Sequence, residues 1–145
     1  MATQAAAYKV EPLETYHWAK EIRLKHFKEV MQAQAEGRLL VTGNMNAPKD
    51  LIAGIGDYIY MGGEPWAVAV SREGGKDIFL PALEAMEKQG FARDMCAFCR
   101  TFSGSMFLGL TPFGPFPKPA FVLGMNQCDS KGKWFQIVAD HLQVP

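Results

Sequence analysis

The spacing of apolar residues predicts a chain that alternates between helices and short strands. Between Thr15 and Glu36, apolar residues recur at helical spacing, and Gly37 then supplies the left-handed residue that commonly ends a helix. A continuous apolar run over 120–125 is typical of a strand in the middle of a parallel sheet. The predicted elements are helices over 15–36, 48–59, 77–90 and from Cys96 toward Leu108, strands over 38–42, 66–70 and 120–125, a last helix after Cys128, and the start of a further strand at 144–145.

The first helix carries two apolar stripes. Leu24, Phe27 and Met31 form one stripe, and Trp18 and Ile22 form the other. The second stripe predicts either a contact with another subunit or a second contact within the same domain. In the two middle helices, the residues expected to face the core are Leu51, Ile52, Ile55 and Ile59, and then Leu80, Leu83 and Met86.

Alternating strands and helices indicate an α/β fold. The expected architecture is an open, mostly parallel sheet with flanking helices, Rossmann- or flavodoxin-like, preceded by the N-terminal helix. Residues 1–13 are expected to form a flexible arm and residues 14–145 a single domain, because a chain of 145 residues suits one hydrophobic core. In such folds ligands bind at the carboxyl ends of the strands. Cys128 follows the predicted strand over 120–125 and is therefore expected in that position.

Composition argues against several kinds of partner. Lys+Arg and Asp+Glu number 15 each, so the chain has no electrostatic footprint for nucleic acid or for an anionic membrane. Its apolar runs are too short to span a bilayer. The first residues lack the basic region and apolar run of a secretory signal, which predicts a cytoplasmic location. Three cysteines are an odd number, which favours reactive or metal-bound thiols over a disulfide framework.

Two of the cysteines stand where helices are expected to begin. Asp94 can cap a helix whose first turn contains Cys96, and Cys128 lies in the turn before the last helix. The amino terminus of a helix carries a partial positive charge and unpaired N–H groups. Both lower the pKa of a nearby thiol and stabilise a thiolate or an anionic cluster. A buried structural role is the alternative for any single cysteine.

Cys96 and Cys99 form a C-x-x-C motif that allows two further interpretations. A zinc site needs four ligands, and the usual second pair of ligands at short spacing is absent. A thioredoxin-like redox pair would use the lowered thiol pKa of a C-x-x-C motif at a helix start. Such a motif should follow an early strand, whereas this one lies late in the chain. A small thiol redox protein and a non-catalytic α/β interaction module both remain open at this point.

Two longer segments resemble a known family. Cys96-Ala97-Phe98-Cys99-Arg100, followed downstream by an apolar strand and then Cys128-Asp129-Ser130-Lys131-Gly132-Lys133-Trp134, is similar to the paired cysteine motifs of the 2-hydroxyacyl-CoA dehydratase / benzoyl-CoA reductase family. The segment from Pro48 to Ile52 also resembles a helix start of that family. Around Gly43-Asn44 and in the helix leading to Cys96, the resemblance is closest to a benzoyl-CoA reductase catalytic subunit.

The resemblance implies an oxygen-sensitive enzyme made of two related subunits, each with two α/β domains. A 4Fe–4S cluster would be held by three cysteines of a subunit. A separate ATP-dependent iron–sulfur activator would donate a low-potential electron, which reduces the thioester of an acyl-CoA substrate to a ketyl radical anion. Dehydratases of the family then expel a 2-hydroxyl group, whereas reductases dearomatise a benzoyl ring. The residues alone do not decide between these reactions.

Few residues carry over from the family. Cys96 and Cys128 match its first two ligand positions. Cys99 stands where family members commonly have no cysteine, so it is a bystander or an alternative ligand. Arg100, Ser103 and Ser105 are candidates for the substrate pocket, with helix surface and turn as the alternative. The third cysteine of the family lies far downstream. The chain therefore resembles the N-terminal domain of a larger two-domain subunit, and the third protein ligand is expected outside it.

Overall fold

The computed structural model describes residues 11–145, so most of the arm expected over 1–13 lies outside the described residues. The longer helices are α1 (Thr15–Gln32), α3 (Gly63–Glu73), α4 (Gly75–Lys88), α5 (Ala97–Leu108) and α6 (Asp129–Leu142), and α2 (Asp50–Ala53) is a single short turn. The strands are β1 (Leu39–Gly43), β2 (Tyr58–Gly62), β3 (Leu110–Thr111), β4 (Gly114–Pro115) and β5 (Phe121–Leu123).

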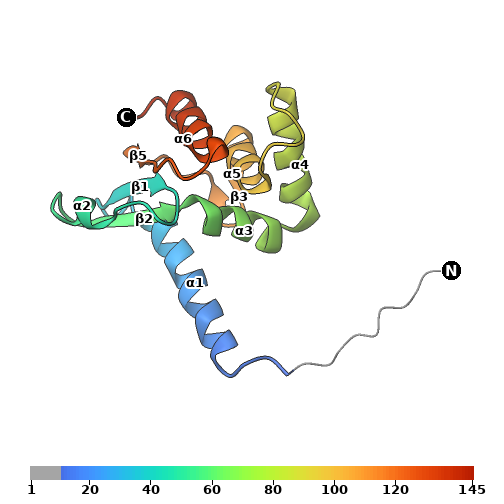
Figure 1. Ribbon diagram of the computed structural model, residues 1–145. Coiled ribbons are helices and arrows are strands. Elements are labelled where there is room, and N and C mark those ends of the chain that lie inside the picture. The colour runs from blue at the N-terminus through green and yellow to red at the C-terminus, as the bar shows by residue number, and fades with distance from the viewer. Residues whose placement is uncertain (1–10) are drawn as a thin grey trace.

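A parallel sheet with the strand order β2-β1-β5 lies at the centre of this arrangement (Figure 1). Leu39 to Gly43 of β1 pair in parallel with Tyr58 to Gly62 of β2, and Val41 to Gly43 also pair with β5. The short strands β3 and β4 form a separate antiparallel pair. The predicted open parallel α/β sheet with an N-terminal helix is therefore confirmed.

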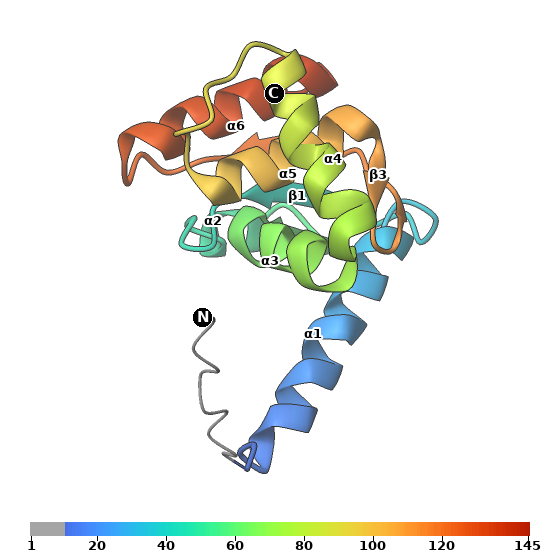
Figure 2. The same cartoon turned by 90° about the vertical axis from the view of Figure 1, so that its right-hand side faces the viewer.

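One face of the sheet carries the main core. Leu40, Ile59 and Met61 point into a large cluster built from the helices. Its centre is aromatic, with the Phe102 ring 5.5 Å from the Trp134 ring in an edge-to-face arrangement. The other face has only a small cluster, formed by Val41, Ala47, Ile52 and Tyr60. Helices α1, α3, α5 and α6 all contribute residues to the main cluster. Figures 1 and 2 show α3, α4 and α5 grouped together beside the sheet.

The strand predicted over 66–70 is wrong, because this segment belongs to α3. Trp66 and Val70 are both buried, one turn apart on the helix, and the alanines between them are buried as well. A short run of buried apolar residues does not distinguish a strand from a helix by periodicity. The chain passes directly from β2 into α3 at Gly62-Gly63.

The helix predicted over 48–59 is also largely wrong. Only Asp50–Ala53 is helical, and the end of the predicted segment is the start of β2. Gly56 has a φ of 141°, which no helix accommodates. As a result Ile52 and Ile59 are buried as expected, whereas Leu51 and Ile55 are 71% and 65% exposed. Leu80, expected to face the core from α4, is exposed too.

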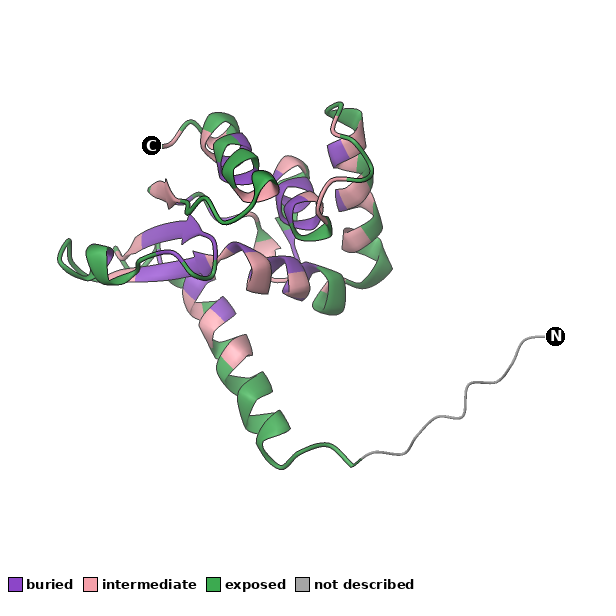
Figure 3. Ribbon diagram, viewed as in Figure 1, coloured by how far each residue is buried: buried purple, intermediate pink, exposed green. Residues whose placement is uncertain are grey.

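Helix α1 extends away from the rest of the domain (Figure 1). Its Phe27 stripe packs into the core, but Trp18 and Ile22 are 65% and 49% exposed. Figure 3 shows exposed residues along the whole first half of the helix. The second apolar stripe is thus not used within residues 11–145, and the contact with another subunit stays a prediction.

The strand expected over 120–125 is present but shorter. Strand β5 covers Phe121–Leu123 and lies at the edge of the sheet within the described residues, because β1 is the middle strand. Beside it, the Val122 N–H donates to the Pro145 carbonyl oxygen at 2.8 Å, a contact that a neighbouring strand would make. No helix in residues 11–145 is long and apolar enough to cross a membrane.

Candidate functional site

Two cysteines mark the starts of two neighbouring helices. Cys96 is the N-cap residue of α5, and Cys128 is the N-cap residue of α6. Because α6 follows β5, its first turn lies at the carboxyl edge of the parallel sheet. Figure 2 shows that α5 and α6 run alongside each other and begin on the same side of the molecule. Both cysteines therefore lie at helix starts, as predicted.

The three cysteines have different surroundings, and all are free thiols in the described chain. Cys128 is exposed, Cys96 is half-buried and Cys99 is fully buried. Burial raises the pKa of the Cys99 thiol to about 12; the neighbouring Ser103 hydroxyl opposes the rise, and the charge of a Cys96 thiolate adds to it. Its burial and its raised pKa together disfavour Cys99 as a redox thiol.

The first turns of both helices are open to an anionic group. Within the described residues, neither the Cys96 nor the Cys128 side chain makes a capping hydrogen bond to its helix. In α6 the Lys131 N–H already donates to the Cys128 carbonyl oxygen at 3.0 Å, so the donor capacity there rests on the two N–H groups before it. The helix dipole adds a partial positive charge, which the Asp129 carboxylate in the first turn of α6 opposes. A thiolate, or a cluster bound to thiolates, would be stabilised by both effects.

The residues predicted for a substrate pocket are covered in the described part of the chain. The Arg100 side chain is only 12% exposed, and its guanidinium pairs with Glu87 at 2.6 Å and donates to the Arg93 carbonyl oxygen at 2.8 Å. Ser103 and Ser105 are completely buried inside α5, and the Ser105 hydroxyl donates to the Phe102 carbonyl oxygen of the same helix. Their role in a substrate pocket stays a prediction.

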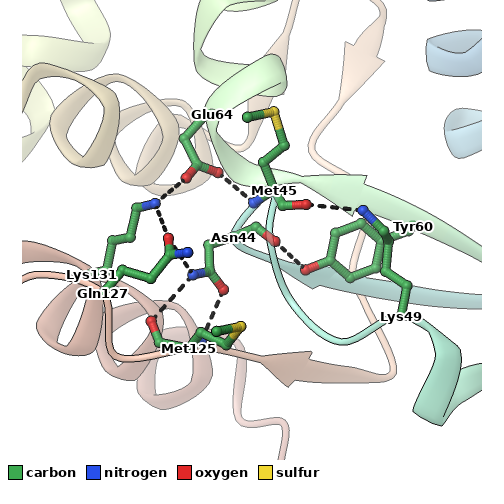
Figure 4. A network of polar contacts seen from close by, with 8 residues as sticks. All are labelled: Asn44, Met45, Lys49, Tyr60, Glu64, Met125, Gln127 and Lys131. Carbon is green, nitrogen blue, oxygen red and sulfur yellow. Dashed lines mark hydrogen bonds and ion pairs between the residues drawn. The ribbon is translucent and has the colours of Figure 1, made fainter.

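A polar network that sequence reasoning missed joins Asn44 to Met125, Gln127, Lys131 and Glu64 (Figure 4). The Asn44 side chain accepts from the Met125 N–H at 2.8 Å and donates to the Met125 carbonyl oxygen at 3.2 Å. It also donates to Gln127 Oε1 at 3.2 Å. Because Asn44 directly follows β1, these contacts extend the pairing of β1 with β5 by one residue beyond the last pair of the ladder.

The network closes through the first turns of α3 and α6. Lys131 donates to Gln127 Oε1 and pairs with Glu64 Oε1 at 2.7 Å. The other Glu64 oxygen accepts from the Met45 N–H at 2.8 Å. We call this closed set the polar ring, formed by Asn44, the Met45 N–H, Glu64, Lys131 and Gln127. The signal that could have located it is polar side chains directly after two strand ends and in the helix turns that follow them.

Gly43 explains how Asn44 comes so close to β5. A Cβ at this position would lie 1.9 Å from the Leu123 carbonyl oxygen and 2.4 Å from the Tyr60 hydroxyl. The Tyr60 hydroxyl in turn donates to the Asn44 carbonyl oxygen at 2.8 Å, and burial raises the pKa of Tyr60 well above its ordinary value. Only glycine fits at position 43, because the end of β1 lies tightly between β2 and β5.

The donor set of the described chain fits part of a metal site. Within residues 11–145, no three His, Cys, Asp or Glu side chains gather closely enough to hold a metal ion. Cys96 and Cys128 offer two accessible thiols at helix starts, and thiolates are the ligands of iron–sulfur clusters. By residue type the two cysteines suit such a cluster, but they do not suffice for all of its ligand positions.

The fold and these thiols define an α/β domain with a candidate thiolate site at the carboxyl edge of its sheet. The family model for the 2-hydroxyglutaryl-CoA dehydratase D-component matches residues 44–145. The chain belongs to this family, and the resemblance found in its sequence is confirmed.

Two curated relatives carry related names. The chain is 28% identical over 130 residues to the (R)-phenyllactyl-CoA dehydratase alpha subunit of Clostridium sporogenes, which covers 89% of this chain and 31% of that protein. It is 26% identical over 126 residues to the (R)-2-hydroxyisocaproyl-CoA dehydratase alpha subunit of Clostridioides difficile, which covers 86% and 30%. The chain thus spans about a third of the length of these relatives.

Proposed function

We propose that this chain is part of the catalytic subunit of a 2-hydroxyacyl-CoA dehydratase, which eliminates water across C2 and C3 of an acyl-CoA thioester. The observation that carries the proposal is the pair of accessible thiols, Cys96 and Cys128, at the starts of two helices in a member of this family. The named relatives are dehydratase subunits, which favours dehydration over reduction of a benzoyl ring.

Cys96 and Cys128 would be two protein ligands of a 4Fe–4S cluster, and further cysteine sulfur would come from outside this chain. The first-turn N–H groups of α5 and α6 would donate to the cluster and its thiolates, which stabilises their negative charge. Cys99 would not be a ligand, because its thiol is buried and holds its proton. When bound, such a cluster would supply a low-potential electron for the thioester carbonyl.

The same proposal includes three partners: a homologous subunit that completes the catalytic pair, an ATP-dependent iron–sulfur activator that delivers the electron, and the acyl-CoA substrate. Support for the subunit partner comes from the relatives, which are both named as alpha subunits. The exposed Trp18 and Ile22 of α1 are an apolar surface that a subunit could cover.

The thiol redox alternative is disfavoured by Cys99. A redox C-x-x-C pair needs a thiol with a lowered pKa and access to a partner protein. Cys99 has neither, since burial raises its pKa to about 12 and its side chain is fully covered. A non-catalytic interaction module is the second alternative. A measurement of dehydratase activity distinguishes the two, because only the dehydratase would turn over a 2-hydroxyacyl-CoA.

The test is turnover by the assembled protein. The chain is purified without oxygen together with its own co-purifying subunits, and a 2-hydroxyacyl-CoA, ATP and the activator are added. We expect formation of the 2-enoyl-CoA, its loss in Cys128→Ala, and its retention in the matched control Cys99→Ala. Turnover of benzoyl-CoA alone would identify a reductase. Turnover that survives Cys128→Ala, or no turnover of any acyl-CoA, would contradict the proposal.

A further inference from the structure

The polar ring holds residues on both sides of Cys128 in the sequence without using its thiol. On the N-terminal side, Met125 and Gln127 are held by Asn44. On the C-terminal side, Lys131 is held by Glu64. In the part of the chain that the structure describes, no hydrogen bond joins the Cys128 side chain to the ring, and the thiol is exposed. The ring therefore fixes where Cys128 lies and leaves its sulfur available.

Three side chains of the polar ring are sheltered from water, and the fourth, Gln127, is exposed. Asn44 is 0% exposed, and the side chains of Glu64 and Lys131 are 13% and 20% exposed. Charge pairs and hydrogen bonds in such surroundings are screened less by water than pairs at an open surface. The turn over 124–128 has no regular secondary structure, so the ring supplies most of its fixed geometry.

The ring also ties together three separate segments. Asn44 follows β1, Glu64 lies in the first turn of α3, and Lys131 lies in the first turn of α6. A contact that only stabilised the fold would need to join only two of these three segments. Their meeting at the edge of the sheet, around the one cysteine that follows β5, is typical of the outer contacts that orient a metal ligand.

We infer that Asn44, Gln127, Lys131 and Glu64 are positioning residues for Cys128, which hold its sulfur in the orientation that cluster binding requires. This inference rests on the proposed function for the identity of the bound group. The positioning itself concerns this chain alone, and it can be measured in the absence of iron.

The first test uses a nitroxide spin label on Cys128. In a Cys96→Ser background the label attaches to Cys128, because Cys99 is buried. We expect a large immobile component in its EPR spectrum and the loss of that component in Gln127→Ala and in Asn44→Ala. Gln127→Glu keeps the acceptor oxygen for Asn44 and Lys131 and should restore it. A label on Cys96 in a Cys128→Ser background should give the same spectrum in all of these proteins.

A matched control separates positioning from loss of stability. Thr42 is as buried as Asn44 and lies two residues before it, but its hydroxyl donates to the Met61 carbonyl oxygen on the other neighbouring strand. Thr42→Val therefore removes one buried hydrogen bond outside the ring and should leave the Cys128 spectrum unchanged. If Asn44→Ala does not fold, the exposed Gln127 gives the deciding variant.

The second test measures iron. In the assembled protein loaded with iron and sulfide, Gln127→Ala should lower the affinity for iron about 10- to 100-fold, as loss of outer contacts does at other metal sites. Equal label mobility in Gln127→Ala and the parent would overturn the inference, whatever the iron result. No iron uptake by the parent, together with a label freed by Gln127→Ala, would reject the proposed function and keep the positioning role.

Discussion

Replacement of Asn44 by alanine should destabilise the fold more than any other single change in the polar ring. The substitution removes the acceptor for the Met125 N–H and the donor for the Met125 carbonyl oxygen, and it leaves a small cavity at a site that is 0% exposed. Loss of the third hydrogen bond, from Asn44 to Gln127 Oε1, should cost little stability, because Gln127 is exposed and still accepts from Lys131. The loss therefore comes from two backbone groups.

The magnitude follows from how far water can reach those groups. A broken hydrogen bond costs about 1 kcal/mol when its partner finds water, and up to about 3 kcal/mol when the partner stays buried and unpaired. Met125 is 38% exposed, so its backbone groups fall between these limits. We expect a loss of about 2–5 kcal/mol for Asn44→Ala, which is a large part of the roughly 5–15 kcal/mol typical of a domain.

The assay is urea unfolding followed by tryptophan fluorescence. Trp66 and Trp134 are buried in the core, so their emission reports global unfolding. With an ordinary dependence on urea, the expected loss lowers the midpoint by about 1–2 M at an unchanged slope. Asn46→Ala, the same change in the exposed turn two residues along, should stay within about 0.5 kcal/mol of the parent. An equal midpoint for Asn44→Ala and Asn46→Ala would refute the reasoning.

Three further outcomes are expected from single residues. Iodoacetamide should alkylate Cys128 first, Cys96 more slowly and Cys99 only on unfolding, because this is the order of their exposure. Peptide mass spectrometry measures the three rates. Rapid modification of Cys99 in the native protein would contradict its burial. The free energy of unfolding should fall as the pH rises from about 9 toward about 12. In the unfolded chain Cys99 releases its proton near its ordinary pKa of 9.0, whereas the native thiol keeps it up to about 12. The expected slope is at most about 1.4 kcal/mol per pH unit. Urea midpoints at rising pH should therefore fall more steeply in the parent than in Cys99→Ala, and parallel curves would argue against the raised pKa. Gly104→Ala should destabilise the fold by about 1–3 kcal/mol or more, because the new Cβ would lie 1.9 Å from a backbone oxygen of α4. In the control Gly132→Ala the nearest neighbour of the new Cβ is 3.6 Å away, so the stability should be unchanged or rise by up to about 1 kcal/mol. A small loss of stability in Gly104→Ala would show that α4 and α5 can move apart.

Local patterns in the sequence predicted the parts of the fold that depend on local chemistry. The helical spacing before Gly37 predicted α1, and the residues around Cys96 and Cys128 predicted two helix starts that the structure confirms. A helix start depends on capping and on the next few residues, so it can be recognised within a short window. The fold class followed from the alternation of such windows.

Features that depend on long-range packing were not predictable in this way. The run from Trp66 to Val70 is buried by residues far away in sequence, and periodicity alone could not decide that it is helical. Asn44 and Met125 are separated by 81 positions, so a local pattern can mark Asn44 as the residue after a strand but cannot show that it bonds to Met125. The ion pair of Arg100 with Glu87 is likewise set by the packing of α4 on α5 and has no local signal, and the substrate pocket expected around Arg100 stays a prediction.

The central claim is that Cys96 and Cys128 are cluster ligands, and its most direct measurement is iron bound per protein with the EPR spectrum of the reduced sample. The chain, assembled with its co-purifying subunits and loaded with iron and sulfide without oxygen, should show a 4Fe–4S signal. The signal should be lost in Cys96→Ala and in Cys128→Ala, and should be kept in Cys99→Ala. An unchanged signal after the loss of Cys128 would contradict the account.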